Sequence, residues 1–193
     1  KYTSDSKSEV VDFEYRILVS GTQEMATCVL SNGLPDGHWQ ITVQEVENSE
    51  VTNMLFKSEF NFVMGVPQQS FKIESDSSAL VGRFLRNGLA HDAWTSYGSN
   101  ALEVDETWYF EEGLLQKIVF DATGREVAVF DTDASQYQTI SLDDQFLLLL
   151  RYNLQDNVGN GNTLQLLSRN REAYQKINSI LTQLGSVPFD MNI

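Results

Sequence analysis

The chain has 193 residues, a length that suits one domain or one domain with an appendage. Its 13 basic and 27 acidic side chains give a net charge of −14, which argues against a nucleic-acid partner and against adhesion to anionic lipid. Cys28 is the single cysteine, so an intramolecular disulfide and a cysteine-based metal site are excluded. The apolar runs are far shorter than the roughly 20 residues of a membrane-spanning helix, so we expect no transmembrane segment.

Residues 1–9 are polar and rich in serine, a composition typical of a flexible leader. The chain begins at Lys1 and not at a methionine, which favours a product from which a targeting segment has been removed. We therefore expect a periplasmic, outer-membrane-attached or secreted protein, and a cytoplasmic location stays open.

Residues 10–131 alternate between apolar and polar side chains, the pattern of half-buried strands. The alternation predicts one strand from Phe13 to Val19 and a second that ends with Ala26, Cys28 and Leu30. Cys28 lies within this second strand, so a buried structural thiol is expected. Residues 45–69 are less regular, and we expect breaks near Asn48-Ser49 and at 65–67, where Pro67 is unsuited to a central strand.

An internal repeat is the clearest feature of the chain. Asn32-Gly33-Leu34, followed by Trp39, recurs 55 positions later as Asn87-Gly88-Leu89, followed by Trp94. Asn-Gly favours a type I′ hairpin turn, because both central residues of that turn have positive φ. Each copy therefore predicts two strands joined by a tight turn, with a tryptophan on the outgoing strand.

A third, less similar unit follows the second copy. Trp108-Tyr109-Phe110 precedes Glu112-Gly113-Leu114, which stands where Asn-Gly-Leu stood before. The repeated aromatic residues are expected to line one face of the sheet, either as core or as a platform for a ligand. The candidate binding residues are Trp39, Trp94, Trp108, Tyr109 and Phe110, and the candidate turn residues are Asn32, Gly33, Asn87, Gly88 and Gly113.

Residues 132–193 change to a helical pattern. Ser141 is a suitable N-cap for a helix that contains the apolar run 146–150. A second helix is predicted from apolar residues at helical spacing and is expected to end at Gly185; these residues are Leu167, Tyr174, Ile177, Leu181 and Leu184. The predicted class is therefore α+β: antiparallel hairpins that form a twisted sheet, followed by two C-terminal helices.

The repeat units resemble the MORN-like repeats of bacteria, of the YwqK antitoxin-like type. The resemblance covers residues 25–131 and is best over residues 80–131. The closest stretch runs from Trp108 through Glu112-Gly113-Leu114 to Lys117 and continues into residues 120–127. In the two clean copies Asp36 replaces the histidine of the family pattern and Asp92 replaces its glycine. The resemblance implies a run of hairpins with a binding or scaffolding role at a bacterial envelope, and it implies no catalytic residue.

Three other groups of residues have the composition of catalytic or metal-binding sites. His91-Asp92 has the composition of an acid–base pair, and with His38 the chain has two histidines. Asp156–Gly161 lacks the ligand spacing of an EF-hand, so a plain loop is favoured. A solvated surface is the simpler interpretation of the acidic residues Asp131, Asp133, Asp143 and Asp144. Nucleophile elbows and phosphate-binding loops are absent from the sequence.

These observations favour a non-enzymatic binding or scaffold protein without cofactor or metal, whose partner is another protein. The alternatives are a carrier of a small apolar ligand, lined by Phe60, Phe62, Phe71, Trp94 and Trp108, and an immunity protein whose acidic surface suits a basic toxin. A hydrolase that uses His91 is the weakest alternative.

Overall fold

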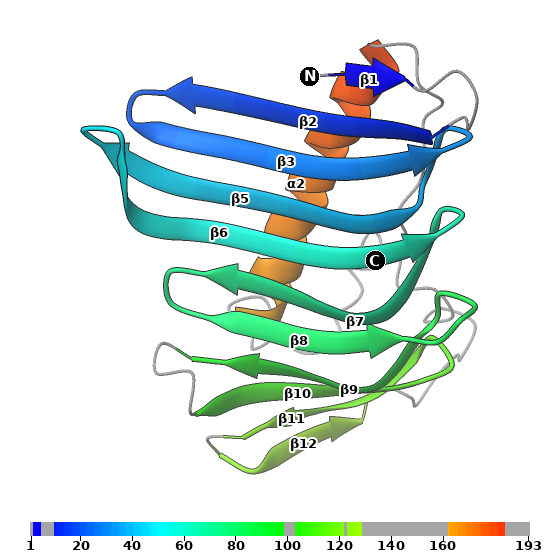
Figure 1. Ribbon diagram of the computed structural model, residues 1–193. Coiled ribbons are helices and arrows are strands. Elements are labelled where there is room, and N and C mark those ends of the chain that lie inside the picture. The colour runs from blue at the N-terminus through cyan, green and yellow to red at the C-terminus, as the bar shows by residue number, and fades with distance from the viewer. Residues whose placement is uncertain (1, 5–9, 99–102, 122, 129–161, 184–193) are drawn as a thin grey trace.

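The computed structural model describes residues 2–4, 10–98, 103–121, 123–128 and 162–183. These residues form a 12-stranded antiparallel sheet and one helix, α2 (Asn162–Gln183), as Figure 1 shows. The strands are β1 (Tyr2–Ser4), β2 (Val10–Val19), β3 (Thr22–Ser31), β4 (Leu34–Pro35), β5 (Gly37–Glu47), β6 (Glu50–Val63), β7 (Val66–Ser75), β8 (Ala79–Phe84), β9 (Ala90–Tyr97), β10 (Val104–Glu111), β11 (Leu114–Phe120) and β12 (Arg125–Ala128).

The sheet is a meander in which each strand lies beside the next one in the chain. The order runs from β1 to β12 without a crossover, and the short β4 pairs with β3 beside β5. Residues 2–4 of the expected leader form β1, which pairs with β2. The β-rich α+β class, with the helix after the sheet, is confirmed. Of the two expected helices the structure describes one; the other, from Ser141 through 146–150, lies outside the described residues.

Tight two-residue turns join many of the strands. In five of these turns both central residues have positive φ. The five pairs are Ser20-Gly21, Asn32-Gly33, Asn48-Ser49, Met64-Gly65 and Glu112-Gly113. This is the type I′ conformation, whose twist matches that of the flanking strands. The first repeat copy and the third unit therefore form the same turn, although Glu112 replaces asparagine.

The second repeat copy turns differently. Gly88 has a φ of 82°, and Asn87 is not among the residues with positive φ. The amide of Gly88 donates to the carbonyl of Leu85 over 2.9 Å, and the amide of Leu85 donates to the carbonyl of Leu89 over 2.8 Å. This is a three-residue loop that ends in a left-handed glycine. One sequence motif thus supports two turn geometries.

The weak alternation in residues 45–69 has a structural cause. The β5–β6 register shifts between Val43 and Gln44 and again between Glu45 and Val46, and the β6–β7 register shifts between Glu59 and Asn61. The bulges interrupt the alternation on either side of Phe56–Phe62, where a period of two is kept. Pro67 lies near the start of β7, and the pairing of β7 with β8 begins after it, at Gln69. The missing N–H of Pro67 therefore leaves no gap in the β7–β8 ladder.

Helix α2 crosses one face of the sheet, drawn behind the strands in Figure 1. We call this side the inner face and the opposite side the outer face. One side of α2 is buried against the inner face: Thr163, Leu164, Leu166, Leu167, Asn170, Tyr174, Ile177 and Leu181. Within the described ranges, no helix has the length and apolar character needed to cross a membrane.

The outer face carries polar side chains along the same strands. Lys57 pairs with Glu59 over 2.9 Å on β6, and Lys72 pairs with Glu74 over 2.5 Å on β7. Lys57 lies opposite Glu74, and Glu59 lies opposite Lys72, so the charges alternate in both directions. The inner face is therefore the apolar one, and any apolar site is expected there.

Candidate functional site

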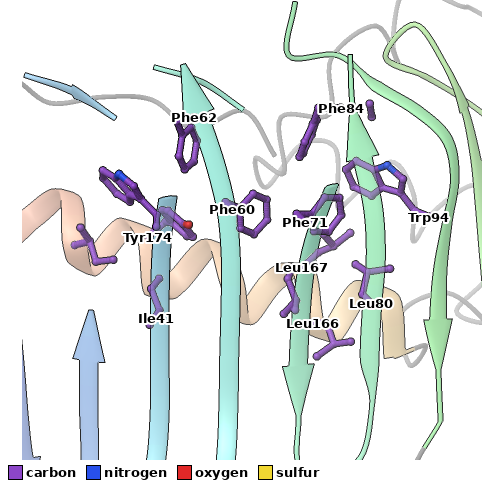
Figure 2. Packing of buried hydrophobic residues seen from close by; sticks show 14 of the residues in the cluster. Ile41, Phe60, Phe62, Phe71, Leu80, Phe84, Trp94, Leu166, Leu167 and Tyr174 are labelled. Atoms are coloured by element: carbon purple, nitrogen blue, oxygen red, sulfur yellow. The ribbon is translucent and has the colours of Figure 1, made fainter. Parts of the chain in front are cut away.

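Aromatic rings cover the inner face from β5 to β10. Phe60 stacks on Phe71 with 4.8 Å between ring centroids, and Phe71 meets Trp94 edge-to-face at 4.7 Å. Trp94 in turn lies 4.6 Å from Phe110. Figure 2 shows the rings of Phe60, Phe71 and Trp94 on the inner face of the sheet, with Leu166, Leu167 and Tyr174 of α2 on the same side. The result is one continuous aromatic layer between sheet and helix.

The tryptophans of the two repeat copies are held in the same way. Trp39 Nε1 donates to the carbonyl of Val29 over 2.8 Å, and Trp94 Nε1 donates to the carbonyl of Arg83 over 3.1 Å. Each indole thus satisfies its polar atom on the preceding strand of its hairpin and is fully buried. The predicted position of a tryptophan on the outgoing strand agrees with this arrangement.

The candidate binding residues are divided between the two faces. Trp39, Trp94, Trp108 and Phe110 belong to the inner layer, where each is at most 4% exposed. Tyr109 points to the outer face, is 38% exposed and lies under the ammonium group of Lys117 at 5.1 Å. A ligand platform made from the buried four would therefore be internal, and Tyr109 is not part of it.

The candidate turn residues lie at the ends of hairpins, away from the aromatic layer. Asn32 and Gly33 connect β3 to β4, and Gly113 connects β10 to β11. Gly88 has a second constraint, because a Cβ atom there would lie 2.6 Å from Val66 Cγ1. Asn87 Oδ1 accepts a hydrogen bond from the amide of Leu89 over 3.1 Å. These residues shape the sheet.

Polar groups attach α2 to the sheet along its length. Asn162 Nδ2 donates to Asp105 Oδ2 over 2.8 Å at the start of the helix. Ser58 Oγ donates to Asn170 Oδ1 over 2.5 Å in the middle, and Lys176 pairs with Glu24 over 2.5 Å further along. The hydroxyl of Tyr174 is buried and makes no hydrogen bond within the described structure. The helix is thus held by discrete polar contacts as well as by apolar packing.

Glu106 is the charged residue of the inner face. It is 3% exposed, and Trp108 Nε1 donates to its Oε2 over 3.1 Å. Burial raises the pKa of its carboxyl; Trp108 and Thr163 lower it by less, and the charge of Asp105 raises it further. The buried hydroxyl of Thr163 makes no hydrogen bond within the described residues. A perturbed buried carboxyl beside an aromatic layer marks a candidate site.

The histidines lie away from this layer. His91 Nδ1 accepts from the amide of Glu112 over 3.2 Å, and Nε2 is 3.6 Å from Asp92, which itself pairs with Arg83. His38 Nδ1 lies 3.2 Å from Asn61 Oδ1 on the exposed side. Among the described residues, no group of three or more His, Cys, Asp or Glu side chains is placed to hold a metal ion.

The remaining candidate residues are Cys28 and a set of acidic and loop residues. Cys28 is fully buried, and burial raises the pKa of its thiol, so it is held as an unreactive neutral group, as expected. The acidic residues Asp131, Asp133, Asp143 and Asp144, together with the loop at 156–161, lie outside the described residues.

Sequence reasoning missed the polar members of the interior. Glu106 is in phase with Trp108 and Phe110 along β10, so alternation alone places it on the inner face. Ser58 is likewise in phase with Phe60. For Thr163 and Asn170, helical spacing from Leu167 was the available signal.

Comparisons with protein-family models, with curated proteins and with solved structures find no match to this chain. The resemblance to MORN-like repeats therefore stays a prediction.

Proposed function

We propose that the protein is a non-enzymatic binding protein that carries a small apolar molecule between the inner face of the sheet and α2. One observation carries the proposal: a continuous aromatic layer from Trp39 to Phe110 faces a single amphipathic helix. Ligand sites in proteins are lined mainly by apolar and aromatic side chains, with a few polar groups that orient the ligand.

The inner layer has this composition. Its apolar surface comes from six neighbouring strands, and its polar groups are few and internal: Ser58, Ser96, Glu106, Thr163 and Asn170. The buried hydroxyls of Thr163 and Tyr174, which complete no hydrogen bond in the described part, add polar capacity that a ligand can use.

Entry of the ligand requires α2 to move. The rings contact one another and Tyr174, so a ligand must displace side chains of the helix. The backbone of α2 comes nearest to β7–β10. In the C-terminal half, Lys176 pairs with Glu24 of β3 and Tyr174 stacks on Trp39 of β5, while Ile177 and Leu181 are fully buried. We propose that the ligand enters under this C-terminal half.

Binding of the neutral fluorescent probe N-phenyl-1-naphthylamine tests the proposal. The three tryptophans of the chain are all fully buried on the inner face, so a probe bound there quenches their emission by energy transfer. We expect saturable binding close to one probe per chain. Native mass spectrometry of the purified protein then identifies any molecule that co-purifies.

Two variants locate the probe. Leu167→Ala enlarges the interior beneath α2, because Leu167 is fully buried, and we expect it to change probe affinity several-fold. Val81→Ala makes a similar truncation on the outer face, where Val81 is 37% exposed, and is expected to leave binding unchanged. Failure of the probe to saturate, or equal responses of the two variants, would overturn the carrier proposal.

A second candidate, contact with another protein, is favoured by a different surface. Leu18 and Val19, at the tip of the β2–β3 hairpin, are 60% and 63% exposed, and Val51 near the neighbouring β5–β6 tip is 57% exposed. The two tips are joined by a hydrogen bond from the amide of Val46 to the carbonyl of Gly21. A photo-crosslinker at position 18, compared with one at position 81, tests it: a defined adduct at position 18 alone supports a protein partner, and matching patterns contradict it.

A further inference from the structure

Glu106 is a charged group placed where an apolar ligand would lie. On β10 it alternates with Trp108 and Phe110, and all three side chains are buried on the inner face. Among the described Asp, Glu, Lys and Arg residues, Glu106 alone is buried. A buried carboxylate is costly unless hydrogen-bond donors or an opposite charge compensate it.

The described surroundings compensate Glu106 only in part. Trp108 Nε1 supplies one hydrogen bond to Oε2. No ion pair joins Glu106 to a basic side chain within the described residues, and Asp105 next to it carries the same charge. A carboxylate can accept about four hydrogen bonds, so the group has acceptor capacity left over.

Thr163 brings a second incomplete group to the same place. It is the second residue of α2 and is fully buried, yet its hydroxyl completes no hydrogen bond in the described structure. Thr163 follows Asn162, whose side chain binds Asp105, the neighbour of Glu106 on β10. The contact between Asn162 and Asp105 fixes the start of α2 over β10, so the two incomplete groups are held together.

We propose that Glu106 and Thr163 form the polar anchor of the interior site, and that the ligand is an apolar molecule whose head group donates hydrogen bonds, with a protonated primary amine preferred. This inference rests on the carrier function proposed above. An ammonium group supplies three donors and the opposite charge, so it can satisfy the carboxylate and the hydroxyl together. Its hydrocarbon chain would then lie along Trp108 and Phe110.

The same geometry disfavours a fatty acid. The charge of Asp105 already opposes ionisation of Glu106. A carboxylate head group placed here would be a further negative charge near Asp105, and near Glu106 whenever that group is ionised, and like charges in a site of low polarity repel. A quaternary ammonium has the favourable charge but no N–H donor. Four compounds that share a dodecyl chain and differ in their head group therefore distinguish the effect of charge on binding from the effect of hydrogen bonding.

Displacement of bound N-phenyl-1-naphthylamine measures the head-group preference. Dodecylamine, dodecanol, dodecyltrimethylammonium and dodecanoate are titrated at pH 7.5 and at physiological ionic strength, below the concentrations at which they aggregate. We expect dodecylamine to bind at least about tenfold more tightly than dodecanoate and several-fold more tightly than dodecyltrimethylammonium, as for a hydrogen bond to a charged group.

Variants assign this preference to the anchor. Glu106→Gln is expected to weaken dodecylamine about tenfold while dodecanol changes by less than about threefold. Thr163→Val keeps the side-chain shape and is expected to weaken the amine less. The matched control is Glu111→Gln, the same change on the same strand at an exposed position of the outer face, and it should leave all four affinities unchanged.

The outcomes distinguish the anchor from the carrier function. If none of the four compounds displaces the probe, the carrier function fails and the anchor with it. If all four displace it equally, or if dodecylamine binding is the same in Glu106→Gln and Glu111→Gln, the carrier function stands and the anchor is wrong. If the amine and the quaternary ammonium bind equally tightly, attraction to the net charge explains the preference and the anchor is again wrong. The series in the wild-type protein tests the proposal even where a variant does not fold.

Discussion

The two repeat copies place their tryptophans in different surroundings. Trp39 stacks on Tyr174 of α2, with 5.8 Å between centroids and 5° between ring planes. Trp94 meets Phe71, Phe84 and Phe110, which all belong to the sheet. Both indoles are fully buried and both donate to the preceding strand. One sequence motif therefore supplies a contact to the helix in one region and a contact within the sheet in the other.

This difference separates a part of the interior whose ring contacts lie within the sheet from a part whose ring contacts include Tyr174 of α2. Around Trp94 the rings come from β7 to β10, where the backbone of α2 also lies closest. Around Trp39 the cover is the ring of Tyr174, and the neighbouring tie is the pair between Lys176 and Glu24. The proposed route of entry lies in the region around Trp39, where Tyr174 and Lys176 of α2 contact β5 and β3.

The largest effect is expected for Trp94→Ala. Loss of a buried indole that contacts three rings should lower the free energy of unfolding by about 4 kcal/mol. Urea denaturation followed by circular dichroism measures it. Tyr109→Ala removes an aromatic ring from β10 on the outer face and is expected to cost less than about 1 kcal/mol. Equal losses in the two variants would contradict a sheet-built core around Trp94.

A smaller loss is expected for Gly82→Ala. A Cβ atom at position 82 would lie 2.6 Å from Trp94 Cδ1 and 2.7 Å from Phe71 Cε1, so the rings must shift. We expect a loss of about 2 kcal/mol, measured in the same way, and a smaller loss when Trp94 is already alanine. The control is Gly98→Ala, because a Cβ atom there meets no atom of the described residues within 4 Å.

A double-mutant cycle separates the two regions directly. Trp39→Leu and Tyr174→Leu should show a coupling of about 1 kcal/mol in the free energy of unfolding, because the two rings stack. Trp94→Leu and Tyr174→Leu should show a coupling near zero. Coupling of equal size in both cycles would mean that α2 supports the whole layer evenly.

Sequence reasoning predicted the hairpin sheet because its signals are local. Alternation reaches from Phe13 to Val19, and Asn32-Gly33 identifies a turn within a few residues. Met64-Gly65 forms the same turn, yet methionine carries no turn signal. The turn was therefore expected as a break near Gly65, without its type.

The interior site could be predicted only in part, because its members meet over long distances in the chain. Alternation places Glu106 on the inner face. Thr163 lies 57 positions later in the sequence, and whether it comes near Glu106 depends on where α2 packs on the sheet. Tyr174 is predicted on the apolar side of a helix, and no local pattern says that it will stack on Trp39. The course of α2 across the strands depends on packing between elements, and no local pattern in the sequence predicts it.

The smallest effect concerns the turns of the two copies, and its size should differ between them. Asn32 has a φ of 51°, a region that glycine enters without strain, so Asn32→Gly should leave the free energy of unfolding within about 0.5 kcal/mol of the wild type. Asn87 lies outside that region and accepts a hydrogen bond from the amide of Leu89. Asn87→Gly loses this bond and increases the freedom of the unfolded chain, so a loss of about 1 kcal/mol is expected. Thermal denaturation of the two variants in parallel measures the difference. Equal losses would show that the two copies turn in the same way in solution, and that the second copy does not need the glycine-terminated loop described here.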